Sequence, residues 1–213
     1  MSKLRGSLWS LLIGSGGLLV SSGAALAHHP MGGQTPDTLL TGVLSGIGHP
    51  IIGIDHLAFV ICVGLASAFV AGRYVTPLAF AAATIAGCAA MLSGITLPYA
   101  EIVITGSVVV MGAIILTGRS LPMPALVGLF SVAGLFHGSA YAAAIVGAET
   151  TPFAGYLVAF AATQYAIAIA AGWVATAVWN AADASALKPR LAGALMAGIG
   201  FAFLAENVEG MLF

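Results

Sequence analysis

The sequence predicts an all-α protein, a polytopic helical bundle that spans a lipid bilayer several times. Of its 213 residues, 60% are hydrophobic and only 6% are charged. A soluble domain has about 25% charged residues because its surface faces water. In lipid only helices and closed barrels can pair all of their own backbone hydrogen-bonding groups. The apolar runs here are far longer than the strands of about 10 residues that build barrels, so the sequence favours helices.

The overall charge and the cysteines exclude two classes of protein. A formal net charge of −1 leaves no basic surface for a nucleic acid. Cys62 and Cys88 both lie within apolar runs. We therefore expect them to be small buried residues rather than a disulfide framework.

The first 27 residues have the pattern of a secretory signal peptide. Lys3 and Arg5 precede an apolar run over 8–20, and small residues ending at Ala27 follow it. An uncleaved anchor helix is the alternative. Cleavage after Ala27 gives three parts: a signal peptide over 1–27, a periplasmic leader over 28–37 and one transmembrane domain over 38–213.

Six apolar segments of helical length follow the leader, separated by glycine, proline and charged residues. We expect transmembrane helices at about 53–71, 75–96, 99–117, 122–147, 152–180 and 190–211. A shorter segment from Thr38 to Gly48 precedes the first, and we expect it to be a half-helix that enters the bilayer without crossing it. The pairs Gly42…Gly46 and Gly134…Gly138 predict close helix contacts.

The basic residues predict the orientation of these segments. If the mature N-terminus is periplasmic, the loops that carry Arg73, Arg119, Lys188 and Arg190 all face the cytoplasm. This agrees with the positive-inside rule, and the two basic residues of the signal peptide start on the same side. We therefore predict a protein of the bacterial inner membrane with both mature termini in the periplasm.

The most informative polar cluster lies at the start of the first span. It is the run His49-Pro50-Ile51-Ile52-Gly53-Ile54-Asp55-His56. Pro50 lacks a backbone donor and Gly53 permits unusual dihedral angles, so the run predicts a break in the helix. Transporters build ion sites at such breaks. Imidazole nitrogens with a carboxylate oxygen suit zinc, nickel, cobalt or copper, and Asp55 could either bind the ion or accept a hydrogen bond from a liganding histidine.

A second cluster lies in the fourth span, where His137 and Tyr141 share one helix face. Glu101 and Gln164 are weaker candidates. A single histidine in a span also serves as a hydrogen-bonding group between helices, and Glu101 could interact with a helix N-terminus.

Two further sets of polar residues lie near the chain ends. His28 and His29 would add a metal-binding group at the mature N-terminus, or belong to a leader without a role. Glu206 and Glu209 are expected at the membrane interface.

These motifs resemble the HupE/UreJ family, whose members are regarded as nickel or cobalt permeases that serve hydrogenase and urease maturation. The family motif HPxxGxDH is matched in full by residues 49–56. The second motif, FHGxAxGxE, is matched from Phe136 to Ala140, and then Ala142 and Ala144 replace its Gly and Glu. The resemblance extends over essentially the whole chain and implies metal contact at His49, Asp55, His56 and His137, with Glu101 as a further candidate.

The sequence thus predicts a secondary permease that moves a divalent cation, nickel or cobalt, from the periplasm to the cytoplasm, with zinc and copper left open. We expect no permanently bound cofactor and no enzymatic activity. The sequence contains no G-x-x-x-x-G-K-[ST] run, the motif with which P-loop proteins bind ATP. It also contains no H-E-x-x-H run of the kind found in zinc metalloenzymes. The alternatives are an accessory subunit that binds metal without transport, an intramembrane metalloenzyme and a haem-binding electron carrier. The expected partners are the bilayer, the cation and, by the resemblance, metalloenzyme maturation proteins. The sequence leaves open whether the protein forms a homo-oligomer.

Overall fold

The computed structural model describes residues 35–142 and 145–212. Within these ranges the protein has seven α-helices and no strand, which confirms the all-α prediction. The helices are α3 (Leu39–Ile52), α4 (Ile54–Ser67), α5 (Thr76–Leu92), α6 (Ala100–Leu116), α7 (Met123–Ala142), α8 (Thr150–Trp173), which continues as the π-helical turn η2 (Val174–Val178), and α9 (Leu187–Leu212). The predicted signal peptide, and His28 and His29, lie outside the described residues.

Three of these helices are long and apolar enough to cross a membrane, namely α7, α8 with η2, and α9. The pair α3 and α4 passes the same test together, bent by 80° at its break. α5 and α6 have 17 residues each; at 1.5 Å per residue they are about 26 Å long, somewhat less than the ~30 Å hydrocarbon core. All six predicted spans thus correspond to helices, while the number that crosses the bilayer stays a prediction.

The segment before the first span is longer than expected. Thr38 caps α3: its side chain accepts from the backbone N–H of Thr41, and the Thr41 side chain accepts from that of Thr38. The helix then runs past Gly48 and through Pro50 to Ile52. Pro50 does not break it, because a proline in the last turn removes only one hydrogen bond near the helix end.

Glycines set the distances between helices, as the paired spacing predicted. A methyl group on Gly42 would overlap the backbone of Pro152 in α8, and one on Gly46 would overlap that of Tyr156. On α7, a methyl group on Gly134 would lie 2.9 Å from the carbonyl oxygen of Phe80, and one on Gly138 would overlap the Thr84 carbonyl. Since lipid is as apolar as the side chains, such close backbone contact is what holds membrane helices together.

The same contacts give the relative directions of the helices. α3 runs parallel to α8, because residues 42 and 46 lie beside residues 152 and 156 in the same order. By the same reasoning α5 runs parallel to α7. α6 and α9 are antiparallel, since Gly112 faces Ala197 and Gly200 faces Val108. These directions are those that six alternating crossings would require.

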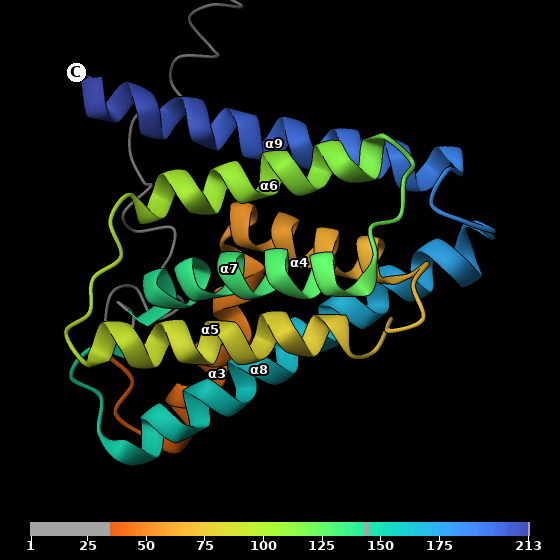
Figure 1. Ribbon diagram of the computed structural model, residues 1–213. Helices are drawn as coiled ribbons and strands as arrows, with labels where there is room; N and C mark the ends of the chain where they lie inside the picture. Colours follow the sequence, from red (N-terminus) through yellow and green to blue (C-terminus); the bar gives the residue numbers. More distant parts are fainter. Residues whose placement is uncertain (1–34, 143–144, 213) are drawn as a thin grey trace, which may run out of the picture.

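Helix α4 is the centre of the described bundle. It contacts all six of the other described helices. In Figure 1, α6 and α9 lie together on one side of α4, α3 and α8 lie on the other, and α5 runs beside α7. Asp55 and His56, in the first turn of α4, are buried in the interior of this bundle, whereas the neighbouring Ile54 is exposed.

Candidate metal site

The break between α3 and α4 consists of Gly53 alone. Its backbone has φ −72° and ψ 101°, values that other residues also adopt. The expected need for unusual dihedral angles is therefore wrong. The glycine instead leaves room for a side chain, because a methyl group there would lie 2.9 Å from Cδ2 of His56.

Asp55 lies in the first turn of α4 and is 2% exposed. Its Oδ1 accepts a hydrogen bond of 2.8 Å from the backbone N–H of His56. A carboxylate at this end of a helix is also favoured by the helix dipole. The bend thus produces a helix N-terminus inside the bundle, and this N-terminus stabilises a buried acidic group.

His56 and His137 are brought together from α4 and α7. Their Nδ1 atoms lie 2.8 Å apart, a hydrogen-bond distance. His137 is fully buried and His56 is 4% exposed. On its other side, the Nε2 atom of His137 lies 3.0 Å from Oγ of Ser107 in α6. Residues 81 positions apart in the sequence therefore form one polar pair in the apolar interior.

His49 reaches the same region from α3. Its Nδ1 lies 3.0 Å from the hydroxyl of Tyr156 in α8, and this hydroxyl also donates to the carbonyl oxygen of Tyr141 at 3.2 Å. The ring of Tyr141 lies between the histidines, with its centroid 4.8 Å from that of His49 and 4.2 Å from that of His56. His49 and His56 thus share one aromatic neighbour, and His56 in turn contacts His137.

Apolar rings close the site further along α4. Phe59, one turn after His56, packs against His137 with a centroid distance of 4.7 Å, and Phe80 of α5 packs against His137 at 5.7 Å. Phe130 of α7 packs on Phe59. The histidine cluster therefore ends at an aromatic layer, and a hydrated ion would have to shed water or displace these rings to pass it.

Two polar atoms beside the site are buried without a hydrogen-bond partner in the described part of the protein. They are the hydroxyl of Tyr141 and Oε1 of Gln164. The amide nitrogen of Gln164 donates to Oγ1 of Thr84 at 3.1 Å. Unpaired buried polar atoms are uncommon, and they often mark places where water or an ion interacts.

The remaining candidates lie elsewhere. Glu101 is exposed in the first turn of α6. Cys62 and Cys88 are buried and free, as expected, and the Cys88 thiol donates to the carbonyl oxygen of Gly138. Across residues 35–142 and 145–212, no three His, Cys, Asp or Glu side chains are grouped closely enough to bind one ion.

Ser107 and Tyr156 were not identified from the sequence. A serine in an apolar helix usually bonds to its own backbone and carries no distinguishing pattern. Tyr156 could have been identified as a hydroxyl within a span that needs a partner.

The geometry allows a metal ion to be bound after a small movement. Two imidazole nitrogens that bind one tetrahedral ion at about 2.0–2.1 Å are about 3.3 Å apart. The Nδ1 atoms of His56 and His137 are 2.8 Å apart. A separation of about half an ångström therefore changes a hydrogen-bonded pair into two ligands.

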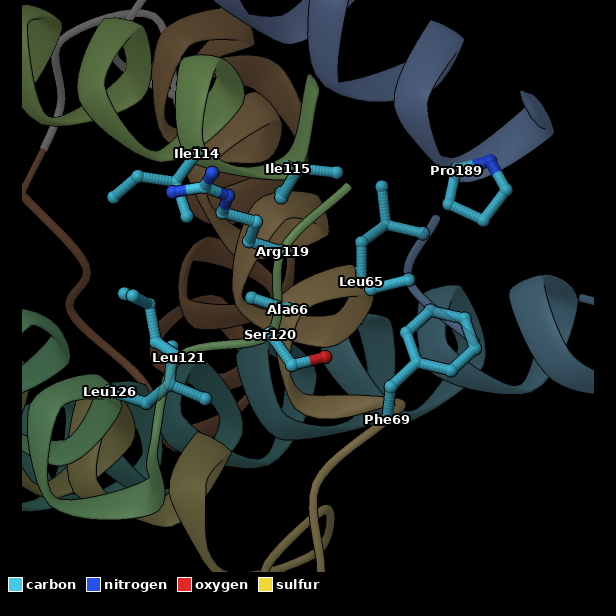
Figure 2. Close-up of a pocket in the computed structure, with 11 residues that line it drawn as sticks. Leu65, Ala66, Phe69, Ile114, Ile115, Arg119, Ser120, Leu121, Leu126 and Pro189 are labelled. Atoms are coloured by element: carbon cyan, nitrogen blue, oxygen red, sulfur yellow. The ribbon is translucent and has the colours of Figure 1, made fainter. Parts of the chain in front are cut away.

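The opposite end of α4 offers a contrasting cavity. Figure 2 shows Leu65 of α4 and Phe69 of the turn after it facing Pro189 of α9, with Arg119 and Ser120 from the segment after α6. The space open to a water-sized sphere is about 10 Å³. This is the lower limit for one water molecule, so the cavity is no ligand site.

Comparison with known proteins agrees with the motif at the bend. The family model described as "HupE / UreJ protein" matches residues 17–203, most of the chain. The chain belongs to the HupE/UreJ family. It is also similar to "Protein HupE" of Rhizobium leguminosarum bv. viciae, with 29% identity over 99 residues. That match covers 46% of this chain and 52% of the relative, so it spans about half the length of the curated protein. No solved structure matches the chain. Its apolar helices and its HupE/UreJ membership identify a helical membrane protein.

Proposed function

We propose that this HupE/UreJ protein is a permease that moves a divalent transition-metal cation, nickel or cobalt, from the periplasm to the cytoplasm. The observation that carries the proposal is the buried His56–His137 pair, with Nδ1 atoms 2.8 Å apart at the centre of an apolar bundle. Burying two imidazoles in the apolar interior of a membrane protein costs free energy. Residues kept there despite this cost usually serve a function. Imidazole is a preferred ligand of nickel, cobalt, zinc and copper.

In this proposal the ion meets His49 first, then His56 and His137. Asp55 supplies negative charge beside His56 and lowers the cost of bringing a dication into the bundle. The ion then passes the layer of Phe59 and Phe80 toward the cytoplasmic side. Such passage needs movement of α4 relative to α5 and α7, since both rings are fully or almost fully buried.

We also propose that the protein lies in the bacterial inner membrane, with both mature termini in the periplasm. The parallel and antiparallel helix contacts agree with alternating crossings, and the positions of the basic residues favour this orientation. It also includes supply of metal to hydrogenase or urease maturation, an expectation that derives from family membership.

A haem-binding role is disfavoured by the geometry. Two axial imidazoles lie on opposite faces of a haem, with the iron between them. The Nδ1 atoms of His56 and His137 are instead in direct hydrogen-bond contact.

Uptake of radiolabelled nickel and cobalt by vesicles that contain the purified protein tests the proposal. Saturable flux that is lost in His56→Ala and in His137→Ala, and kept in Ser139→Ala, is the expected result. Ser139 is a suitable control because its hydroxyl donates to the carbonyl oxygen of Phe136 in the same helix and contacts no histidine among the described residues. Metal binding without flux in the wild type would refute the permease and favour an accessory subunit that holds metal.

A further inference from the structure

Ser107 makes two contacts that together determine the direction of its hydrogen bonds. Its Oγ lies 2.6 Å from the carbonyl oxygen of Ile104 and 3.0 Å from Nε2 of His137. A hydroxyl has one proton, and a carbonyl oxygen can only accept. The Ser107 proton therefore goes to Ile104, and its oxygen accepts the N–H of His137 Nε2.

Tyr156 follows the same rule on the other side of the cluster. Its hydroxyl lies 3.2 Å from the carbonyl oxygen of Tyr141 and 3.0 Å from Nδ1 of His49. A hydroxyl proton donated to the carbonyl oxygen leaves the hydroxyl oxygen to accept the N–H of His49 Nδ1. Tyr156 is fully buried, which keeps water from competing for either bond.

We propose that Ser107 and Tyr156 are positioning residues of the metal site, each selecting the tautomer of one histidine. Ser107 holds His137 with its proton on Nε2, so that Nδ1 presents the lone pair. Tyr156 holds His49 with its proton on Nδ1, so that Nε2 presents the lone pair. This inference rests on the proposed metal permease. In other metal sites, a group that accepts a hydrogen bond from a liganding histidine strengthens metal binding.

The assignment also locates the proton between the two rings. Since Nδ1 of His137 carries a lone pair, the proton in the 2.8 Å contact belongs to Nδ1 of His56. An ion that binds His137 Nδ1 takes the place of this hydrogen bond.

The tautomers can be measured without metal. The full-length protein in detergent micelles, labelled with ¹⁵N-histidine and held at a pH where the rings are neutral, should show His137 as the Nε2–H form and His49 as the Nδ1–H form. Ser107→Ala should change the ring signals of His137 and, through the shared hydrogen bond, those of His56, and leave those of His49 unchanged. Tyr156→Phe should change those of His49 alone.

Two matched controls separate positioning from packing. Ser139→Ala and Tyr165→Phe each remove a hydroxyl that donates to a backbone carbonyl, at 2.8 Å to Phe136 and at 3.2 Å to Tyr74. Neither should change a histidine tautomer. Ser107→Thr, which keeps the hydroxyl, should restore the wild-type signals of His137.

Metal affinity provides the second readout. Nickel binding by calorimetry should weaken about 10- to 100-fold in Ser107→Ala and in Tyr156→Phe, the range seen when such partners are removed. It should be unchanged in both controls. Unchanged tautomers in Ser107→Ala and Tyr156→Phe would overturn the inference, as would a wild type that binds no metal. If the wild type shows the expected tautomers and binds metal without transporting it, the positioning role is supported and only the proposed permease function is contradicted.

Discussion

Adding one methyl group to Gly138 should push α7 away from α5. The new Cβ would lie 2.7 Å from both Cα and C of Thr84, and closer still to its carbonyl oxygen. Ordinary Cβ contacts begin near 3.4 Å, so the two backbones must separate by more than about 0.7 Å. Forcing extra volume into a packed interface costs about 1–3 kcal/mol.

The displacement should also reach the histidine pair, because His137 precedes Gly138. The hydrogen bond from the Cys88 thiol to the Gly138 carbonyl, now 3.0 Å, crosses the same interface and should weaken. We therefore expect Gly138→Ala to lower both stability and metal flux.

Gly128→Ala is the matched control, since it lies in the same helix and its added methyl group would meet nothing within 4 Å. Replacing Gly by Ala within a helix favours the helix by up to about 1 kcal/mol in both variants, so this effect cancels in the comparison. The free energy of unfolding in mixed detergent micelles, followed by loss of helical circular dichroism, should be about 1–3 kcal/mol lower for Gly138→Ala than for Gly128→Ala. Equal values for the two variants would refute the packing argument.

Three further predictions concern charge and protons. Asp55→Asn keeps an oxygen that can accept from the His56 N–H, so helix content should persist while nickel affinity measured by calorimetry falls about 10-fold or more; unchanged affinity would contradict a role for the charge. Nickel uptake should decrease as the external pH falls from 7 to 5, because protons compete with metal for imidazole, and constant uptake would argue against histidine ligands. In the exposed segment before α9, the Ser185 side chain and backbone N–H donate to Asp183 and lower the pKa of its carboxyl group. Ser185→Ala should raise the pKa of Asp183 in an NMR titration. In the wild type, the lowered pKa means that the ionised carboxylate stabilises the turn at neutral pH, and that this stabilisation is lost as the pH falls through the lowered value.

Much of the site was predictable because its residues are unusual for their surroundings. His49, Asp55, His56 and His137 stand out in a chain with 6% charged residues, and the bend between α3 and α4 lies within the run that predicted it. The role of Gly53 was assigned wrongly, because sequence cannot distinguish a glycine needed for its dihedral angles from one needed for space. The pairing of His56 with His137 could not be predicted, since it depends on how α4 and α7 pack.

The sequence by itself determined that this is a helical membrane protein of the HupE/UreJ family, with a helix break at the HPxxGxDH motif and a few buried polar residues. These properties follow from composition and local patterns, which need no knowledge of distant contacts. Only the tertiary structure decided that His137 contacts His56 and Ser107, and that Tyr156 contacts His49. The reason is physical: which rings meet depends on close contacts at glycines between helices far apart in the chain, and which hydroxyl lies beside each ring depends on the same packing.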